Sequence, residues 1–289
     1  MSNKANTYRR RRAARKKTVN FKAIAISVAV ALVCYAAAFS LDSFAPASSQ
    51  PVAQGEYSAE ALSVVTIPAS TPQIMKDYEG FTVSFNPECH QPNYVVWELT
   101  GEESDGTNKR ESNFRPDPSV PDCATLDDYR NSGYDRGHMA PAADMKWSRE
   151  AMADCHYLTN ICPQDHKLNS GRWSTLEAKS RTWAKRDSAI IIISGPILTD
   201  IMPRKIGKSE IPVPERFFKV ILSPYSNPPR AIGFIVPNIP NAEGIEKLAV
   251  SVDQVEAITG FDFFSALPDS LENAIEARLN FRDFNRQTK

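Results

Sequence analysis

Residues 133–142 read Gly133-Tyr134-Asp135-Arg136-Gly137-His138-Met139-Ala140-Pro141-Ala142, and they carry more information about fold and chemistry than any other part of the chain. At their centre, Asp135-Arg136-Gly137-His138 places a base, a cation and a turn-permitting glycine side by side. The turn-forming residues 130–133 precede this tetrapeptide. We therefore expect it in an exposed turn, because exposed loops are where catalytic side chains concentrate.

Three polar residues follow the tetrapeptide in order: Asn160, Asn169 and Glu177. Taken singly, they would be an ordinary strand-end residue, a helix N-cap and a solvated helix face. Taken together, His138 supplies a base, Arg136 supplies a cation for a phosphate, and the amide oxygens suit a hard metal ion. These are the groups that metal-assisted cleavage of a phosphodiester requires.

The charge of the chain is divided by position. Cations and acids both number 34, but nine of the cations and none of the acids lie in residues 1–22. The rest of the chain holds 25 cations against 34 acids, which argues against a protein that binds nucleic acid over its whole surface. A local basic groove is still expected near the motif, formed by Lys167, Arg172, Lys179, Arg181, Lys185 and Arg186.

Residues 23–41 form an uncharged run of 19 residues. At about 1.5 Å per residue, this run approaches the ~30 Å of a bilayer core. Because the basic tail 1–22 precedes it, we predict an uncleaved transmembrane signal-anchor at a bacterial inner membrane, with the catalytic body in the periplasm. A cleaved signal peptide, giving a secreted protein, and an Arg-rich mitochondrial leader are the alternatives.

The body contains four cysteines: Cys89, Cys123, Cys155 and Cys162. In an oxidising compartment they predict two disulfides, with three pairings that the sequence does not rank. The alternative is a zinc site, which the neighbours Cys89-His90 and Cys155-His156 suggest. The chain has no Cys-x-x-Cys pair, and this counts against zinc.

The remaining sequence predicts an α/β (α+β) domain with a central, largely antiparallel sheet flanked by helices. Residues 42–77 are rich in Ala, Ser and Pro and are expected to be a flexible linker before a domain at 78–289. Apolar periodicity predicts strands at 81–85, 94–99, 157–160, 189–193, 217–222 and 231–236. Helices are expected at 148–153, 168–186, 242–259 and 268–280, the second with Trp173, Leu176, Ser180 and Trp183 on one stripe.

Three blocks of this sequence closely resemble those of the DNA/RNA non-specific endonucleases, a family that includes secreted bacterial nucleases and mitochondrial endonuclease G. The blocks are residues 133–142, residues 157–164 (Tyr-Leu-Thr-Asn-Ile-Cys-Pro-Gln), and residues 168–173 (Leu-Asn-Ser-Gly-Arg-Trp) followed by Glu177. The resemblance covers about residues 78–285 and implies a ββα-metal active site. Cys155 and Cys162 lie outside the family pattern, either as a disulfide beside Asn160 or as two buried thiols.

The resemblance implies a role for each matching residue. His138 is expected to be the general base that activates a water for attack on phosphorus, and Asn169 the single protein ligand of Mg²⁺, with Mn²⁺ as a substitute. Mg²⁺ prefers oxygen ligands and usually keeps several waters. Glu177 would lie ~12 Å from Asn169 along one helix, so we expect it to contact the metal's waters. Asn160 is expected to position His138 or the phosphate.

The same resemblance assigns the cations. Arg136 is expected to stabilise the negative charge of the pentacovalent transition state. The family also uses an upstream arginine, for which Arg110 and Arg115 are both candidates and Arg110 is preferred. Arg115, Gln164 and Arg172 are expected to contact substrate.

The expected function is therefore a Mg²⁺-dependent, sugar-non-specific endonuclease that binds DNA and RNA through their phosphate backbones. Two alternatives are a phosphodiesterase acting on a small nucleotide and a non-catalytic, membrane-anchored protein that binds or takes up DNA. The sequence also leaves open a homodimer and a proteinaceous inhibitor as partners.

Overall fold

The computed structural model describes residues 58–199, 201–240, 243–279 and 281–286. The basic tail, the predicted transmembrane segment 23–41 and the first part of the predicted linker lie outside these residues. Within the described ranges, no helix combines the length and apolar character needed to cross a bilayer.

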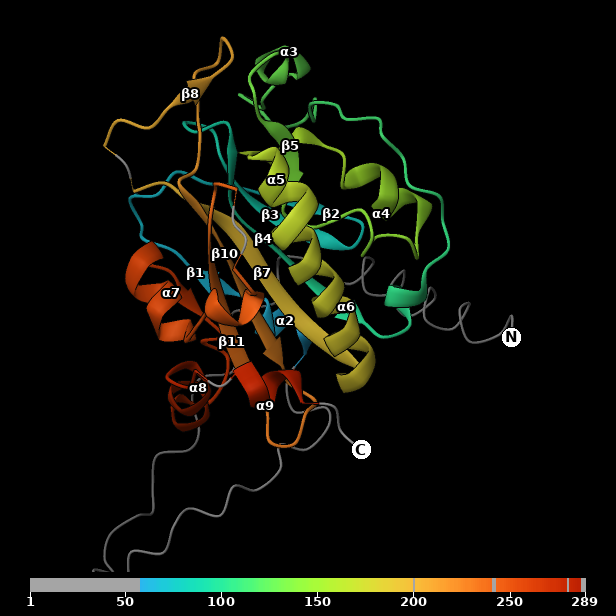
Figure 1. Cartoon of the computed structure of the whole chain (residues 1–289), viewed down its shortest axis with the longest axis vertical. Coiled ribbons are helices and arrows are strands. Elements are labelled where there is room, and N and C mark those ends of the chain that lie inside the picture. The colour runs from blue at the N-terminus through green and yellow to red at the C-terminus, as the bar shows by residue number, and fades with distance from the viewer. Residues whose placement is uncertain (1–57, 200, 241–242, 280, 287–289) are drawn as a thin grey trace, which may run out of the picture. The chain divides into compact units, whose positions relative to one another are not determined.

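A central antiparallel sheet organises the described part of the chain (Figure 1). Its seven strands run in the order β12-β11-β10-β7-β4-β3-β2, and each neighbouring pair is antiparallel. The strands are β2 (Ile74–Tyr78), β3 (Phe81–Asn86), β4 (Gln91–Thr100), β7 (Ala189–Ile197), β10 (Arg216–Ser223), β11 (Arg230–Pro237) and β12 (Ala249–Val250). Three short ladders accompany the sheet: β1 (Val65–Thr66) with β13 (Asp262–Phe263), β5 (Asp135–His138) with β6 (Ile161–Gln164), and β8 (Lys205–Ile206) with β9 (Ile211–Pro212).

Helices and single turns connect these strands. The helices are α2 (Ala59–Leu62), α3 (Leu126–Tyr129), α4 (Arg149–Asp154), α5 (His166–Leu168), α6 (Ser174–Asp187), α7 (Val252–Thr259), α8 (Asp269–Glu276) and α9 (Phe281–Asn285). The turns are η1 (Glu103–Asp105), η2 (Leu158–Asn160), the π-helical η3 (Asn169–Trp173) and η4 (Ile245–Lys247). Chain segments α5, η3 and α6 follow one another without a break and carry three of the predicted site residues, Asn169, Arg172 and Glu177.

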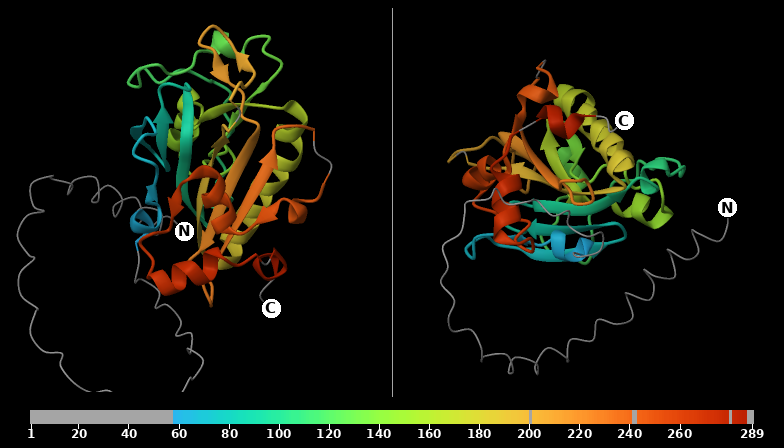
Figure 2. Two further views of the ribbon diagram at one scale, coloured as in Figure 1. Left: turned by 90° about the vertical axis from the view of Figure 1, so that its left-hand side faces the viewer. Right: turned by 90° about the horizontal axis from the view of Figure 1, so that it is seen from below.

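The middle of the central sheet is buried on both faces. On β7, Ile190 and Ile192 belong to a hydrophobic cluster with Trp183 of α6, whereas Ile191 and Ile193 belong to another cluster. The second cluster is completed by side chains of α2, α7 and α8, and Figure 2 shows α6 and the pair α7 and α8 on opposite sides of the sheet. Because successive strand residues face opposite ways, a strand covered on both sides reads as a continuous apolar run.

The predicted fold class is confirmed, and so is most of the predicted sheet. The strands expected at 81–85, 94–99, 189–193, 217–222 and 231–236 all lie within observed strands of the central sheet. The helix expected at 168–186 is present as the end of α5, η3 and α6, and the one expected at 148–153 is α4. The predicted stripe on the former helix is buried, with exposures of 0–1% for Trp173, Leu176, Ser180 and Trp183.

The predicted linker extends too far along the chain. Residues 58–77 contain α2, β1 and most of β2, and β2 forms one edge of the central sheet. Leu62 is 1% exposed in the cluster that covers one face of that sheet. The elements of this segment are two to five residues long, too short to produce a sustained hydrophobic period.

Three local predictions are wrong for identifiable reasons. The strand expected at 157–160 is the turn η2, and the strand β6 begins one residue later. The helix expected at 242–259 is confined to α7, because Ser251 and Gln254 form a capping box that starts the helix at Val252. The tetrapeptide Asp135–His138 is the strand β5, paired residue by residue with β6, and not a turn.

The two predicted disulfides are absent from the described residues. Cys89, Cys123, Cys155 and Cys162 are all free thiols, and the last two are fully buried. The sequence-based expectation depended on an oxidising compartment, which four cysteines alone do not establish.

The packing of α2 predicts that the start of the folded unit is needed for stability. Leu62→Ala should lower the free energy of unfolding by about 2–4 kcal/mol, because it opens a cavity in the second cluster. Val64→Ala, a neighbouring control at 50% exposure, should change it by less than about 0.5 kcal/mol. Urea unfolding followed by tryptophan fluorescence measures both values. Equal effects of the two substitutions would show that residues 58–64 do not pack as described.

Candidate active site

The β5–β6 ladder presents the central motif, and Gly137 is required there for close packing. A Cβ atom placed on Gly137 would lie 2.3 Å from Oε1 and 2.6 Å from Cβ of Gln164. The glycine therefore allows β5 to lie against the Gln164 side chain and does not form a turn. Gln164 is itself fully buried, and neither amide atom has a hydrogen-bond partner. This burial argues against the predicted contact between Gln164 and substrate.

His138 ends β5 and is 6% exposed. Its backbone carbonyl accepts a hydrogen bond from Nε1 of Trp173 at 3.1 Å, and its ring centroid lies 5.1 Å from Phe114 and 5.0 Å from His156. Burial holds the pKa of His138 well below its usual value, and the nearby His156, Arg110 and Arg136 lower it further. The imidazole is therefore neutral at pH 7, as a general base must be.

Asn160 fixes the backbone that follows His138. Its Oδ1 accepts a hydrogen bond from the Ala140 amide at 2.9 Å, and its Nδ2 donates to the carbonyl oxygens of Ala140 and Cys155 at 2.9 and 2.8 Å. Its own carbonyl accepts from the amide of Met139 at 3.0 Å. The side chain is completely buried. Of the two roles expected for Asn160, this geometry supports the positioning of His138.

Asn169 is oriented by the first residue of the motif. Its Nδ2 donates to Oδ2 of Asp135 at 2.9 Å, and the same carboxylate oxygen lies 2.9 Å from Nδ1 of the exposed His166. Binding of the amide nitrogen to Asp135 directs the amide oxygen away from that carboxylate, where it can meet a cation. Asn169 also begins the π-helical turn η3, an irregularity that is frequent at functional sites.

Of the three arginines predicted to serve the site, Arg110 and Arg136 act on the His138 ring and Arg115 does not. Arg136 is exposed and lies over the Phe114 ring at 4.5 Å. Besides the dominant effect of burial, the Arg110 cation lowers the pKa of His138 and opposes the raised pKa of Glu177. Arg115 instead lies over the Tyr157 ring at 4.0 Å. Arg110 is thus the upstream arginine whose charge reaches both predicted site residues.

Beneath Glu177 lies a buried ion network that the sequence analysis did not identify. Lys219 of β10 is 1% exposed and its Nζ lies 4.9 and 4.6 Å from the ring centroids of Trp97 and Trp173. Burial raises the pKa of Glu177, and the Lys219 ammonium opposes that rise. Asp144, also buried, accepts hydrogen bonds from Arg181 and Trp97. The sequence feature that could have indicated this network is the lysine within the apolar run 217–222.

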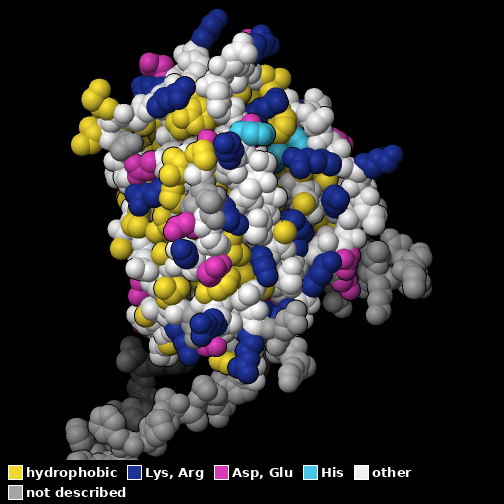
Figure 3. All heavy atoms as spheres, in the orientation of Figure 1, with side chains coloured by type: hydrophobic (Ala, Val, Ile, Leu, Met, Phe, Trp, Pro, Cys, Tyr) yellow, Lys and Arg dark blue, Asp and Glu magenta, His cyan; other side chains and the backbone are white. Residues whose placement is uncertain are grey.

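The predicted basic groove is partly neutralised by acids. Arg181 pairs with Asp144 at 2.8 Å, Lys185 pairs with Asp105 at 2.5 Å, and Arg186 pairs with Asp187. Lys167 remains exposed, while Lys179 and Arg172 are half-buried. Figure 3 shows Lys and Arg side chains gathered around exposed histidine atoms on this face of the molecule. The positive charge that these side chains can offer to a phosphate is therefore smaller than the sequence indicates.

Comparison with known proteins identifies the family to which this chain belongs. A sequence model of the DNA/RNA non-specific endonucleases matches residues 58–270. The chain belongs to that family. The match begins at residue 58, so it includes both α2 and the edge strand β2.

Individual relatives carry nuclease names. The chain is 37% identical over 207 residues to the mitochondrial nuclease EXOG of Danio rerio, covering 66% of this chain and 60% of the relative. It is 34% identical to human mitochondrial endonuclease G (65% and 69% covered) and 33% identical to the mitochondrial nuclease of Saccharomyces cerevisiae (73% and 72% covered). The chain spans 57–60% of the length of the EXOG relatives from Danio rerio, Xenopus laevis and Mus musculus.

A solved structure supports the fold. The crystal structure of an EndoG/EndoGI complex aligns with a TM-score of 0.65 at 26% identity, and the alignment covers 68% of this chain and 88% of that one. The predicted location at a bacterial inner membrane is wrong: the relatives from animals and yeasts are named as mitochondrial nucleases.

The contact between Gly137 and Gln164 predicts that one methyl group disrupts the site. Gly137→Ala should destabilise the protein by about 1–3 kcal/mol through overpacking and lower any activity that depends on His138. Gln164→Gly, introduced as a second substitution, should recover part of both losses by removing the atoms that clash. Gly171→Ala is the matched control, because a Cβ there meets nothing within 4 Å. Thermal unfolding of the wild type and the three variants tests this account, which fails if Gly171→Ala is as harmful as Gly137→Ala.

The ion network predicts a shift in pH dependence. A carboxylate that loses a neighbouring cation keeps its proton to higher pH, so Lys219→Met should raise the pKa of Glu177 further. If deprotonated Glu177 is needed, the acidic limb of kcat/KM should move to higher pH in Lys219→Met. It should stay in place in the exposed control Lys208→Met. The shift should also be absent when Lys219→Met is combined with Glu177→Gln, and a limb unmoved by Lys219→Met would contradict the coupling.

Proposed function

We propose that this chain is a metal-dependent endonuclease that hydrolyses phosphodiester bonds in both DNA and RNA. The observation that carries the proposal is the buried, neutral imidazole of His138, which lies within the influence of two arginine cations. A base that stays unprotonated beside positive charge suits an anionic substrate. The arginines attract the phosphate, and they also lower the pKa of the base, so that it stays neutral and can accept a proton. Membership of the non-specific endonuclease family supports the same reaction class.

The protein groups have separate roles in this proposal. His138 takes a proton from the attacking water, and its neutral state makes a ring nitrogen available at pH 7. Arg136, held over Phe114 and exposed, binds the phosphate and stabilises the charge that develops on its oxygens. Arg110 is the second cation, and its charge reaches both His138 and Glu177. Asn160 holds the backbone after His138 so that the ring keeps its position.

The donor groups fit a hard divalent cation such as Mg²⁺, with Mn²⁺ as a substitute. Asn169 offers an amide oxygen whose orientation is set by the hydrogen bond to Asp135. Glu177 offers a carboxylate that would contact the waters of the ion. Oxygen ligands with several retained waters are what Mg²⁺ prefers, and the bound ion would supply Lewis-acid stabilisation of the phosphate oxygens.

Weak selectivity between DNA and RNA follows from the groups that are present. The cations around His138 recognise phosphate, which both nucleic acids share, and phosphate contacts carry no direct sequence information. Binding should depend steeply on salt, as expected for contacts that release counterions. A protein inhibitor is a further partner that we propose, because the matched solved structure is of EndoG with EndoGI.

The proposal predicts that catalysis and retention of nucleic acid can be separated. With Mg²⁺ present, His138→Ala should lower the rate of plasmid nicking about 10²–10⁴-fold, the usual contribution of a general base. Retention of DNA in a gel-shift assay should be largely unchanged, since the arginines remain. His90→Ala, a histidine far along the chain from the motif, is the matched control and should nick at the wild-type rate.

The same assays distinguish the alternatives. Asn169→Ala should be inactive at Mg²⁺ concentrations that saturate the wild type. Wild-type protein that retains DNA but never nicks DNA or RNA would identify a binding protein instead. Faster cleavage of a dinucleotide than of long DNA or RNA would identify a phosphodiesterase acting on small substrates.

A further inference from the structure

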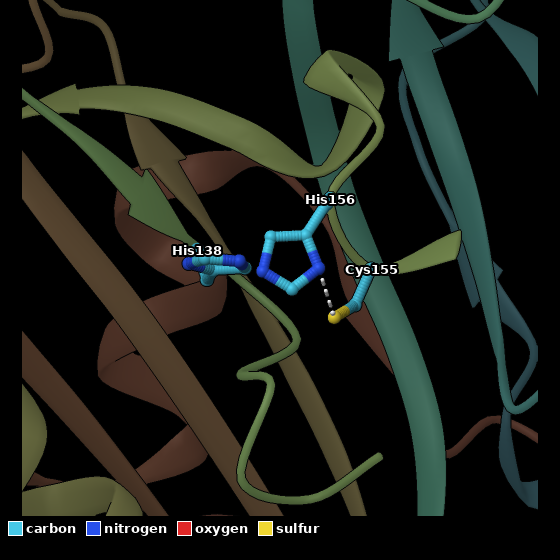
Figure 4. Close-up of side chains that lie close together, drawn as sticks. All are labelled: His138, Cys155 and His156. Carbon is cyan, nitrogen blue, oxygen red and sulfur yellow. Dashed lines mark hydrogen bonds between the residues drawn. The ribbon is translucent and has the colours of Figure 1, made fainter. Parts of the chain in front are cut away.

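In the described part of the chain, two groups of three side chains bring possible metal ligands within 4.8 Å of one another. The first group is His138, Cys155 and His156, shown in Figure 4. Its donors do not converge on one point, because the Sγ of Cys155 faces Nδ1 of His156 at 3.4 Å, and that nitrogen donates its proton to the carbonyl oxygen of Met152 at 2.8 Å. The second group lies on other elements and has a different chemistry.

The second group consists of three carboxylates: Asp253 and Glu256 of α7, and Glu276, which ends α8. Val255 and Ile275, the residues directly before Glu256 and Glu276, both pack into the second hydrophobic cluster. The apolar side chains therefore fix the rotation of each helix against the sheet. As a result the fold itself holds these acids together, on the side of the sheet opposite to α6 (Figure 2).

Glu276 is the member of this group that indicates a ligand. Its side chain is 5% exposed, and its Oε1 has no hydrogen-bond partner. Buried charged groups are normally paired or bound to a metal, because a carboxylate that leaves water without compensation is costly. Asp253 and Glu256 cannot supply that compensation, since they carry the same charge. A proton would neutralise one of the three carboxylates, whereas a divalent cation would compensate all of them.

The wider surroundings of Glu276 are also acidic. Burial raises the pKa of Glu276 to about 9, and Glu256, Glu272, Asp253 and Asp262 contribute to the rise. These acids come from α7, β13 and α8. Among the described residues, no lysine or arginine forms a salt bridge with any of the five acids. The cluster therefore has a concentrated negative charge that the protein does not balance.

We propose that Asp253, Glu256 and Glu276 form a binding site for Ca²⁺ that joins α7 to α8. Ca²⁺ takes roughly six to eight oxygen ligands at about 2.3–2.6 Å, so donors on opposite sides of the ion are about 4.6–5.2 Å apart. The separations of 4.8 Å or less between these oxygens lie within that span. Mg²⁺ has shorter bonds of about 2.0–2.1 Å and a strict octahedral geometry, and it is usually held by only one or two carboxylates.

The ion at this site stabilises the fold and takes no part in hydrolysis. Its ligands come from two helices that separate when the chain unfolds, so Ca²⁺ binds the native state and raises its stability by mass action. Glu256 is already fixed for this role, because a carboxylate oxygen accepts a hydrogen bond from the amide of Phe263 at 2.9 Å. Glu177 lies on α6, across the sheet from these ligands.

Thermal unfolding of the full-length chain, freed of divalent cations with a chelator, tests the site. Ca²⁺ at 100 times its dissociation constant, measured by titration calorimetry, should raise the Tm by roughly 5–10 °C. Glu276→Gln should lose this shift but be at least as stable as the wild type without Ca²⁺, because a buried, unbalanced carboxylate is gone. Asp253→Asn should bind Ca²⁺ at least 10-fold more weakly. Glu246→Gln removes an exposed acid outside the cluster and should behave like the wild type.

A variant at the catalytic site excludes binding there. Asn169→Ala lacks the proposed Mg²⁺ ligand and should keep the full Ca²⁺-dependent shift. A wild type that Ca²⁺ does not stabilise would show that a proton alone satisfies Glu276, and would overturn the proposal. Equal shifts in the wild type and Glu276→Gln would overturn it as well. Because the measured quantity is thermal stability, the result is independent of the proposed nuclease activity.

Discussion

The pairing of β5 with β6 is the interaction on which the rest of the site depends. It places His138 opposite Ile161 and Asp135 opposite Gln164, and the amide of Asn160 extends the pairing beyond the end of β5. The Asn160 side chain makes three hydrogen bonds to backbone groups in a buried setting, where such bonds are strengthened by the low dielectric. A substitution that left these groups unpaired would cost more than the bonds themselves contribute. The ladder therefore has little freedom to shift, and the base keeps its position.

Burial influences the protonation states of both His138 and Glu177. An enzyme that binds polyanions needs cations near its base, and the base must itself be neutral to accept a proton. Burial keeps His138 neutral, and the adjacent arginines act in the same direction. For Glu177 burial acts in the opposite sense, favouring the protonated form, and Lys219 counters it from below. A buried lysine between two tryptophans is costly unless it is paired, so its position under Glu177 is better explained by the site than by stability.

The sequence predicted the sheet well where a strand is long and covered on both faces. The run 189–193 could be assigned because each of its four isoleucines, residues 190–193, enters one of two hydrophobic clusters. Short elements could not be predicted. Strands β1 and β13 have two residues each, and they are strands only because they pair with each other in the folded chain. The same reason explains why residues 58–77 were expected to be a linker. The boundary of α7 depended on a capping box that a longer apolar pattern concealed.

The site residues that belong to the sequence motif could be predicted. Those whose role depends on how side chains pack could not. His138, Asn160, Asn169 and Glu177 follow from residue type and order, but the choice between Arg110 and Arg115 depends on the direction of each side chain. Phe114 contacts both His138 and Arg136, yet its sequence context is that of an ordinary loop residue. Its position is set by backbone hydrogen bonds between residue 115 and residues 156 and 158, a contact between segments about 40 residues apart.

Those backbone bonds also fix the surroundings of His138. The segment 155–158 is held against residue 115, and the His156 ring lies with its centroid 5.0 Å from that of His138, where it helps to lower the pKa of His138. The exposed side of the site offers oxygen atoms, from Asn169 and the phosphate, and these select a hard ion. Because the proposed ion and the base use different side chains, an ion held by Asn169 leaves the lone pair of His138 available to take a proton.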